Sequence, residues 1–585
     1  MRWVSILFVV VLALVGGDLR AATYHVDQQA PMASDNNAGN EAAPWKTVAR
    51  AAAAKELRPG DVVLIHAGVY REHIEVKVSG EPGRPITLAA APGNRVMVKG
   101  SEIVRGKWTR LAGQSERKEP YPDAFANVWK VPLDEPYFTD ARFQGRYQNK
   151  SRRWVSQVFV NDERPLQRIG ADPIYKNEKT LHLATIGRGL DDLIENSFFF
   201  DPADQALYMK MSGQPDWFSI EVGVRGFLLT AQKVHDVVIR GLEFRHNRQP
   251  GGMWPMASID QCERLTVDQC SFRLSDFCGL GLAKCKACTV HNCDLSCNGN
   301  TGLGMGECQD CLVEGCTLLF NNYRRFHSAW SPAGMKCIPG NFRCTIRDCE
   351  AAYNIAAGGI WFDTENGDIH ILGNVCHHND GAGIFFEINK RGGIIADNLA
   401  YANRDRGIYI SGSQNTWVVH NTVACNESGI VCMPRGDEWP LENVRVLNNL
   451  LIRNYITADT VTRGCDLTLF MGPYSSPPYR RTVLSNHSDY NVYANTSWTP
   501  ILQHHWNCNN VLAKWQERFQ EDVHSTLAPI IFEQRGTGIA LPACDGLARP
   551  GPLPDDLRAI IQPPPHVGCR RTAWPAGPSG GAVGR

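Results

Sequence analysis

The chain has 585 residues, and its 60 basic residues are balanced by 60 acidic ones. This length exceeds a single compact core, so the chain forms several domains or one elongated repeat architecture. The neutral balance, with no DNA-reading motif in the sequence, excludes nucleic acid as a partner. Only 21% of the residues are charged and 53 are glycine, which is typical of a turn-rich β protein rather than a helical one.

Residues 1–22 are predicted to be an export signal. Arg2 precedes an apolar run from Val4 to Val15, and small residues follow at Ala21 and Ala22. The run is too short and too early for a spanning helix with a stop-transfer flank, although an uncleaved anchor is the alternative. We therefore expect a mature chain without a membrane span, either secreted or periplasmic.

Residues 23–106 are expected to cap and begin a repeat architecture. The stretch PWKTVARAAAAKELRPGDVVLIHAGVYRE (44–72) predicts a short Ala-rich helix, a turn at Pro59-Gly60-Asp61 and a strand. Such a helix would cover the strand edges of an open first coil. Residues 107–224 interrupt the pattern with irregular strands such as VFVNDERPL, and we predict that they form an inserted β-rich subdomain.

A sequence repeat organises residues 225–500. Its unit is apolar-x-x-(Cys/Asn)-x-x-x-x-Asn, and its central column, at spacings of 23 to 33 residues, holds Leu242, Cys270, Cys293, Cys316, Cys349, Asn374, Asn398, Asn421 and Asn449. A second column opens short apolar strands at Gly279, Gly302, Gly334, Gly359, Gly383, Gly407 and Gly429. These units are too short for propeller blades and lack the leucine pattern of leucine-rich repeats. They predict an all-β parallel β-helix, in which equal phases of successive coils form ladders.

The recurring Asn and Cys residues are expected to stack along this helix. Asn at a turn position can take a left-handed conformation and bond to the same residue of the next coil. Thirteen cysteines lie between Cys262 and Cys349, and the CxxC pairs at 285–288 and 308–311 match a zinc-ribbon spacing. The repeat period accounts for that coincidence, so buried thiols are favoured. Cross-coil disulfides and zinc are the alternatives, and the pair His377-His378 is a weaker metal candidate.

The C-terminal part is predicted to close the helix. SDYNVYAN (488–495) is expected to be the final coil, and VLAKWQERFQEDVHS (511–525) to be a short helix and turn within a closing segment, residues 501–546. Residues 547–585 are rich in Pro and Gly and are predicted to be disordered.

The glycine-led strands carry the candidate catalytic residues. In the pattern G-I-x-φ-x the third and fifth residues face outward. The third positions are Lys336, Trp361, Phe385 and Tyr409, and the fifth positions are Ile338, Asp363, Glu387 and Ser411. Sugars bind aromatic platforms through their apolar faces, and glycoside hydrolysis uses two carboxylates. The alternatives are a Ca²⁺ site formed by both acids with Glu365, or solvated strand residues without a role, although stacked like charges are unfavourable.

Several of these stretches resemble a known family. The export signal, the 44–72 cap, the series AGMKC, GIWFDTEN and GIFFEI, and SDYN are similar to secreted bacterial right-handed β-helix proteins of the pectate-lyase-like superfamily, and most of all to its β-helix glycoside hydrolases. The resemblance covers most of residues 23 to 530, and the Cys ladder departs from the usual apolar or Asn stack. It implies a right-handed helix, and catalytic roles for Lys336, Asp363 and Glu387.

The expected function is therefore a secreted glycoside hydrolase that acts on a poly- or oligosaccharide. Lys336 is expected to keep Asp363 ionised as nucleophile or base, whereas Phe385 and Asp363 are expected to raise the pKa of Glu387, which suits a general acid. The proposed substrate-binding residues are Trp361, Phe385, Tyr409, Trp330, His327 and Arg391. No cofactor is expected apart from the Ca²⁺ alternative, and the chain is expected to be a monomer.

Two other functions stay open. A polysaccharide lyase acting on uronates needs a cation and a Lys or Arg base, often with calcium. Lys336, Arg391, Arg404 and Arg406 would supply such groups. A non-catalytic glycan-binding or structural β-helix is the third reading, which an inserted subdomain lying over the carboxylates would favour.

Overall fold

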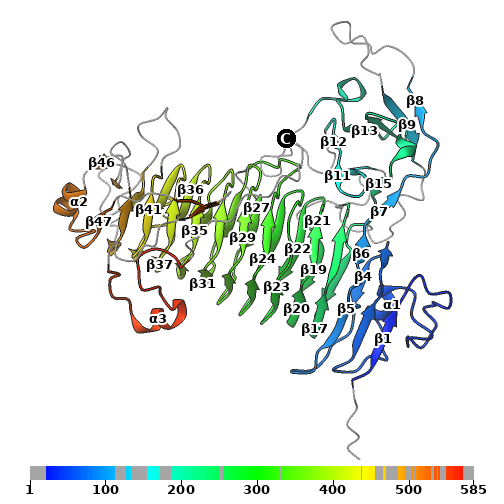
Figure 1. Ribbon diagram of the computed structural model, residues 1–585, viewed down its shortest axis with the longest axis horizontal. Coiled ribbons are helices and arrows are strands. Elements are labelled where there is room, and N and C mark those ends of the chain that lie inside the picture. The colour runs from blue at the N-terminus through cyan, green and yellow to red at the C-terminus, as the bar shows by residue number, and fades with distance from the viewer. Residues whose placement is uncertain are drawn as a thin grey trace, which may run out of the picture.

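The computed structural model describes residues 21–111, 127–133, 154–171, 186–248, 254–328, 331–436, 438–454, 465–469, 485–494, 502–504, 507–509, 512–528, 533–535, 538–540 and 549–570. The strands stack into one long parallel β-helix, whose coils run along the long axis of the molecule from β1 to β47 (Figure 1). The predicted parallel β-helix is confirmed. Three sheets, here called sheets 1, 2 and 3, form its sides.

Sheet 1 contains thirteen described strands: β1 (Thr23–Val26), β2 (Val62–Ile65), β5 (Ile86–Ala90), β17 (His235–Arg240), β20 (Glu263–Asp268), β23 (Thr289–His291), β25 (Leu312–Glu314), β28 (Thr345–Arg347), β31 (Gly367–Leu372), β34 (Arg391–Ala396), β37 (Thr416–Val419), β40 (Arg445–Leu447) and β43 (His487–Asp489).

Sheet 2 carries the glycine-led strands: β4 (Ile74–Val76), β16 (Leu229–Gln232), β19 (Pro255–Asp260), β22 (Cys278–Ala283), β24 (Thr301–Gly306), β27 (Ala333–Ile338), β30 (Gly358–Asp363), β33 (Ile384–Glu387), β36 (Arg406–Ser411), β39 (Ser428–Met433), β42 (Leu467–Leu469), β45 (Leu502–His504) and β46 (Asn507–Asn509). Sheet 3 begins with β3 (Gly68–Tyr70), β6 (Val96–Lys99), β18 (Leu242–Arg245) and β21 (Ser271–Arg273), and continues with β26 (Thr317–Leu319), β29 (Glu350–Ala352), β32 (Val375–His377), β35 (Leu399–Tyr401), β38 (Thr422–Ala424), β41 (Leu450–Ile452), β44 (Val492–Ala494) and β47 (Thr526–Leu527).

Helices and a hairpin complete the described elements outside the insertion: α1 (Val48–Ala52), α2 (Leu512–Phe519), α3 (Asp555–Ile561), β48 (Glu533–Arg535) and β49 (Gly538–Ala540). The predicted capping helix is α1. Thr47 caps it by accepting a hydrogen bond from the Arg50 N–H at 3.1 Å, and Glu72 accepts from the N–H groups of Val48 and Ala49. The helix therefore presents its buried face to the first coil with its amino end satisfied.

The second repeat column is glycine because successive coils approach closely at this corner. A Cβ atom on Gly359 would lie 2.5 Å from the carbonyl oxygen of Gly383 on the next coil, and one on Gly383 would lie 2.7 Å from that of Gly407. No side chain fits at such distances, so the glycines allow the coils to stack tightly.

Asn side chains form continuous hydrogen-bonded ladders inside the helix. The Asn398 Nδ2 atom donates to Asn421 Oδ1 at 3.0 Å and to the Ile371 carbonyl at 2.9 Å, and the Asn398 Oδ1 atom accepts from the amide and side chain of Asn374. The left-handed residue is the one before each Asn, for example Asp397 with φ 59°, so the predicted left-handed Asn is wrong by one position. The reason is that Asn must point inward to join the ladder.

Replacement of one ladder residue is expected to destabilise the fold. Asn398→Leu would leave the Asn374 N–H without its acceptor and the Ile371 carbonyl without its side-chain donor inside the protein, because Asn398 is fully buried. Each unsatisfied buried group costs about 1–3 kcal/mol. We expect urea unfolding to show a loss in this range, and an unchanged midpoint would contradict the ladder.

Thirteen cysteines between Cys262 and Cys349 are buried free thiols, as the ladder interpretation predicted. Burial raises the pKa of Cys270 and of Cys278 to about 12. Such thiols resist alkylation because the thiolate is the reactive form. We expect mass spectrometry after unfolding and alkylation without reductant to find most of the thirteen alkylated and no stoichiometric zinc. Four or more disulfides in this region would contradict the structure.

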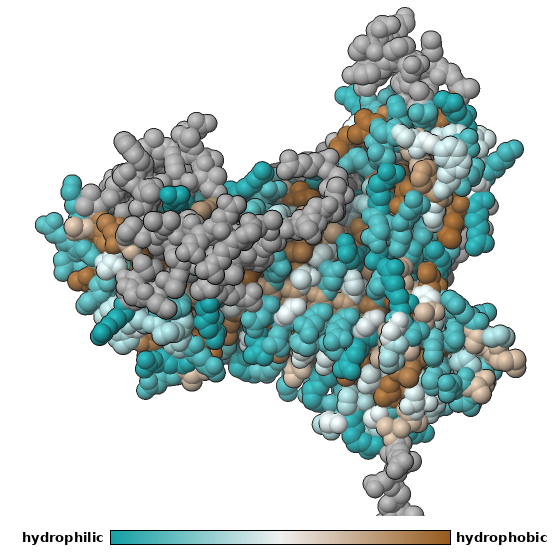
Figure 2. Space-filling model, in the orientation of Figure 1, coloured by the Kyte–Doolittle hydropathy of each residue, from teal (hydrophilic) through white to brown (hydrophobic). Residues whose placement is uncertain are grey.

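The described strands between Ser101 and Gly223 lie outside the three sheets of the β-helix, in the region where an inserted subdomain is predicted over residues 107–224. It contains β7 (Ser101–Ile103), β8 (Thr109–Arg110), β9 (Val128–Pro132), β10 (Val158–Val160), β11 (Arg164–Pro165), β12 (Gln167–Arg168), β13 (Ser197–Asp201), β14 (Ala206–Lys210), β15 (Ile220–Gly223) and two 3₁₀ turns, Leu190–Asp192 and Pro215–Trp217. It leaves the helix between two stacked coils, because β17 pairs directly with β5. Figure 2 shows apolar residues on its surface, whereas the visible flank of the helix is largely hydrophilic.

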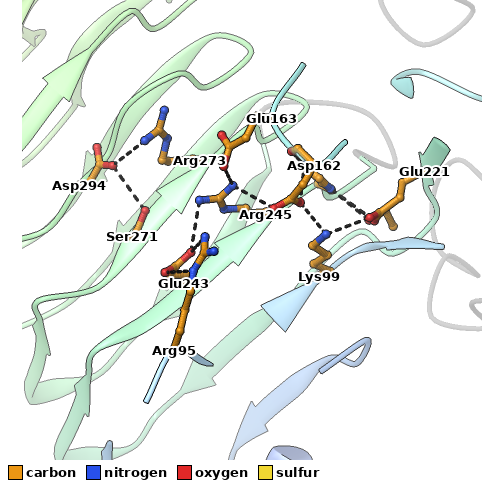
Figure 3. Close-up of polar contacts among 12 residues, drawn as sticks. Arg95, Lys99, Asp162, Glu163, Glu221, Glu243, Arg245, Ser271, Arg273 and Asp294 are labelled. Carbon is orange, nitrogen blue, oxygen red and sulfur yellow. Dashed lines mark hydrogen bonds and ion pairs between the residues drawn. The ribbon is translucent and has the colours of Figure 1, made fainter. Parts of the chain in front are cut away.

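A buried charge cluster joins this subdomain to the β-helix (Figure 3). The Lys99 Nζ atom donates to Glu221 Oε1 at 2.9 Å and contacts Asp162 Oδ1 at 2.5 Å. Arg245 forms ion pairs with Asp162, Glu163 and Glu243. Lys99 and Arg245 belong to sheet 3, whereas three of their partners belong to the insertion. The cluster therefore fixes the orientation of the subdomain.

The junction is expected to weaken in acid. Burial alone would raise the pKa of Glu221, but the bonds from His246, Arg71 and Ser101 hold that pKa well below its usual range. Such a carboxylate stabilises the fold above its unfolded pKa of about 4.3, and the stabilisation is lost as the pH falls towards the folded value. Glu221→Gln removes this contribution, so its melting temperature should lie below that of the wild type at neutral pH and approach it below about pH 4. A constant difference would contradict this assignment.

The C-terminal residues 549–570 pack on the β-helix, so the predicted disorder of residues 547–585 is wrong for this part. Leu557 and Ile561 of α3 contact Ile394 and Val419 on the outer face of sheet 1, and the Gly551 N–H donates to Asn448 Oδ1 at 2.7 Å. This segment packs despite its Pro and Gly content, because its few apolar residues contact apolar residues on the outer face of the β-helix. Within the described ranges, no helix has the length and apolar character that crossing a membrane requires.

Candidate functional site

The register of sheet 2 brings the predicted catalytic residues together. Strands β30 and β33 pair so that Asp363 lies beside Glu387 and Trp361 beside Phe385. Lys336 precedes Trp361 on the neighbouring coil, and Tyr409 follows Phe385. The inward residues of these strands, such as Ile360, are fully buried in the core. The alternating pattern and the 24-residue repeat therefore align the two carboxylates, as predicted.

Asp363 lies between a cation and a hydroxyl. The Lys336 Nζ atom donates to Asp363 Oδ2 at 2.8 Å, and the Thr364 hydroxyl donates to Asp363 Oδ1 at 2.8 Å. Lys336 is only 6% exposed, and its ammonium also lies over the Trp361 ring, 2.8 Å from the centroid. Burial lowers the pKa of Lys336 to about 8, although Asp363 opposes this shift.

Glu387 is paired with a cation that the sequence analysis missed. Its Oε2 atom accepts a hydrogen bond from the Trp361 Nε1–H at 3.0 Å, and its Oε1 atom forms an ion pair with Arg435. The predicted environment of Glu387 contained only Phe385 and Asp363, and a contacting guanidinium favours the ionised carboxylate instead. Arg435 follows β39 in a segment without repeat phase, so no sequence signal pointed to it.

The predicted aromatic platforms are stacked on one another. The ring centroids of Trp361 and Phe385 are 5.1 Å apart, and those of Phe385 and Tyr409 are 4.5 Å apart, with interplanar angles of 20° and 13°. Lys336 covers the outer face of this stack at one end, and Arg406 covers it at the other, 4.3 Å from the Tyr409 centroid. The faces of these rings are therefore covered by one another and by the two cations, so that only ring edges remain to contact a ligand. This corrects the expectation of exposed apolar faces.

These residues line a groove of about 1510 Å³ along the outer face of sheet 2. The groove extends from the coil of β19 to the coil of β39. Its lining includes Trp254, Ser258, Phe277, Gly281, Gly304, Lys336, Trp361, Asp363, Asp380, Phe385, Glu387, Arg404, Asp405, Arg406, Tyr409, Glu427 and Arg435. No described residue of the inserted subdomain is among the lining residues, so that part of the insertion does not cover the carboxylates.

Two described residues of the predicted substrate-binding set, Arg391 and His327, do not join this groove. Arg391 begins β34 on sheet 1, where its guanidinium lies 5.9 Å from the Phe342 ring. The prediction for it is wrong because the chain turns from sheet 2 to sheet 1 after Glu387. His327 is exposed and is not among the lining residues, although the adjacent Ser328 is. Trp330 lies outside the described residues.

Basic side chains of the described groove lining are each paired with a carboxylate. In addition to the Lys336–Asp363 and Arg435–Glu387 pairs, Arg404 contacts Asp380 at 3.2 Å, and Arg406 contacts Asp405 at 2.8 Å. Glu307 and Glu427 also line the groove, which makes its lining net negative. Within the described residues, no group of three or more His, Cys, Asp or Glu side chains is arranged to hold a metal ion.

Comparisons with known proteins agree with this fold. A family model described as "Right handed beta helix region" matches residues 330–470. The solved structure of XylC in complex with xylose superimposes with a TM-score of 0.61 and 14% identity, over 89% of both chains. A protein described as "Glycoside hydrolase" gives a TM-score of 0.42 at 12% identity, covering 84% of this chain and 98% of that one, too low a score to support an argument.

A shorter stretch is 32% identical to the uncharacterized protein YwoF of Bacillus subtilis over 78 residues. The match spans 13% of this chain and 16% of YwoF, so it covers only a small part of that relative. Together with the register of the three sheets, these findings define the chain as a right-handed parallel β-helix protein, as predicted.

Proposed function

We propose that the protein is a carbohydrate-active enzyme, a glycoside hydrolase that cleaves a poly- or oligosaccharide outside the cytoplasm. The single observation that carries the proposal is the alignment of Asp363 and Glu387 on adjacent coils within a large groove. Two carboxylates that flank one bond are the machinery of most glycoside hydrolases.

Asp363 is assigned as the nucleophile. Lys336 and Thr364 orient its carboxylate, because each donates a hydrogen bond to one of the two oxygens. Its oxygen attacks the anomeric carbon while the glycosidic bond breaks, which gives a glycosyl-enzyme ester. Water then attacks the same carbon and releases Asp363 as the carboxylate.

Glu387 is assigned as the general acid and then the base. In the first step it protonates the departing oxygen, and in the second it accepts a proton from the attacking water. Arg435 opposes protonation, but its side chain is 55% exposed, whereas that of Lys336 is 7% exposed. Arg435 is thus the cation able to leave its carboxylate, which favours Glu387 rather than Asp363 as the acid.

The spacing of the two acids favours retention of configuration. Neighbouring coils are about 4.8 Å apart, nearer to the ~5–5.5 Å of retaining enzymes than to the ~6.5–9.5 Å of inverting enzymes. Product analysis by nuclear magnetic resonance during the first minutes of hydrolysis would distinguish the two outcomes.

A uronate lyase is the second candidate, because Lys336 has a pKa of about 8 and would be a competent base near neutral pH. The charge of the groove lining argues against a uronate lyase. A lyase must neutralise the uronate carboxylate, yet every described basic side chain of the lining is already paired with an acid. A neutral sugar suits such a lining better, and a non-catalytic binding role is the third candidate.

The deciding experiment incubates the mature protein with chromogenic glycosides and with neutral and uronate polysaccharides. Xylosides are the first choice because XylC, which has the same fold, was solved with xylose. Reducing ends and ultraviolet absorbance are recorded together. New reducing ends without an unsaturated product support the hydrolase. Unsaturated uronate identifies the lyase, and binding without either signal identifies a glycan-binding protein.

A further inference from the structure

The groove continues well beyond the carboxylates towards the N-terminal coils. At the phase of Lys336, the three preceding coils carry Ser258, Gly281 and Gly304, as the strand register shows. At the phase of Asp363, two of these coils carry Ala283 and Gly306, the third carries Asp260, and Ile338 lies between Gly306 and Asp363. The floor of this arm therefore has small side chains, apart from the Pro255 ring, which covers Gly281. We call this floor the glycine trough, formed by Ser258, Gly281, Ala283, Gly304 and Gly306.

A tryptophan lies at the far end of the trough. Trp254 precedes β19 and is 51% exposed, and among the described lining residues it is the one large apolar side chain with such exposure. The Phe227 ring contacts it edge to face, with centroids 5.9 Å apart. Phe227 thus supports the indole while much of its surface stays open. The Trp361–Phe385–Tyr409 stack offers no comparable face, because its rings and two cations cover one another.

The distance between Trp254 and the carboxylates matches an extended ligand. Four coil steps separate β19 from β30 in sheet 2, which corresponds to about 19 Å at the usual strand spacing. Sites for drug-sized ligands have about 300–1,000 Å³, whereas this groove has about 1510 Å³. One sugar at the carboxylates would leave the trough and the indole without a ligand.

We propose that Trp254 and the glycine trough form a distal subsite that makes the enzyme select oligosaccharides over short glycosides. The sugar chain lies along the trough, where Gly304 and Gly306 give it room, and a remote sugar stacks its apolar face on the indole. Binding energy from that remote unit supports reaction at Asp363 and Glu387. This inference rests on the proposed function for its catalytic part, and on the groove alone for its binding part.

Two substitutions test the subsite. Trp254→Ala removes the stacking surface, and Gly304→Leu fills the trough two coils before Asp363. A Cβ on Gly304 would meet only Cys278 Sγ, at the ordinary distance of 3.6 Å, so Gly304→Ala serves as the folding control. Trp217→Ala is the matched control for the indole, because Trp217 is 70% exposed on the inserted subdomain.

The readout is kcat/KM for the aryl glycoside that the wild type cleaves best and for the matching linear oligosaccharides of two to six units. In the wild type, kcat/KM should rise with chain length. Trp254→Ala should lower the ratio of the hexasaccharide value to the aryl glycoside value about tenfold, and Gly304→Leu should lower it further, whereas Trp217→Ala leaves the ratio unchanged. A ratio unaffected by both test variants overturns the proposal.

Calorimetry separates failure of this proposal from failure of the proposed function. Xylo-oligosaccharides and oligogalacturonates of one to six units are titrated into the wild type and the same variants. If no substrate is hydrolysed but affinity rises with length and falls in Trp254→Ala, the hydrolase assignment is wrong and the subsite stands. If aryl glycosides are hydrolysed but affinity is independent of length in both series, the subsite is wrong and the hydrolase stands.

Discussion

Glu387→Gln is expected to lose about 10²–10⁴-fold in kcat on natural glycosides, while retaining turnover of activated aryl glycosides. The departing oxygen of a natural glycoside needs a proton, whereas an activated phenolate leaves without one. Asp363→Asn is expected to abolish turnover of both substrate types, because no covalent intermediate forms without the nucleophile. The measurement is kcat and kcat/KM on one aryl glycoside and one oligosaccharide for each variant.

Glu365→Gln is the matched control for these variants. Glu365 is exposed and only two residues beyond Asp363, so the same change of charge occurs close by without touching the pair. Its activity should equal that of the wild type, and a large loss would favour the calcium alternative. Equal activity of all three variants on a substrate that the wild type cleaves would place catalysis elsewhere. Melting curves should show that each variant is folded.

Lys99→Met is expected to cause the largest loss of stability outside the groove. Lys99 is 4% exposed and Glu221 is 3% exposed, so the substitution leaves a buried carboxylate without its lysine partner. Removal of one member of a buried pair typically costs about 3–5 kcal/mol. Glu221 keeps its ion pair with Arg71 at 3.0 Å, and Asp162 is partly exposed and also contacts Arg245. We therefore expect about 3 kcal/mol from urea unfolding, at the lower end of that range.

Lys130→Met is the control, because Lys130 pairs with Asp204 on the surface of the same subdomain. Such exposed pairs contribute little, so its unfolding midpoint should stay close to that of the wild type. Limited proteolysis should cut Lys99→Met faster around residues 101–223 than elsewhere, since the cluster orients the insertion. Equal stability of the two variants would show that the cluster does not hold the subdomain.

The repeat allowed the position of each residue within a coil to be predicted. Asp363 and Glu387 share a phase, and stacked coils place equal phases side by side, so their contact followed from spacing alone. The Asn ladder followed in the same way, apart from its backbone conformation. The phase of a residue does not reveal what covers it, however. For this reason Trp361 and Glu387, expected on an outer face, proved to be 8% and 3% exposed.

Residues outside the repeat were beyond such prediction. Arg435, Trp254 and the packed segment 549–570 have no phase, and their contacts depend on where non-repeating chain folds back onto the helix. The prediction for Arg391 was wrong for a related reason. Only a few residues beyond β33, the chain has already turned from sheet 2 onto sheet 1. Local periodicity thus encodes the β-helix and the alignment of its two acids. Their cations, the closed faces of the ring stack and the length of the groove arise from contacts between distant segments, which no local pattern records.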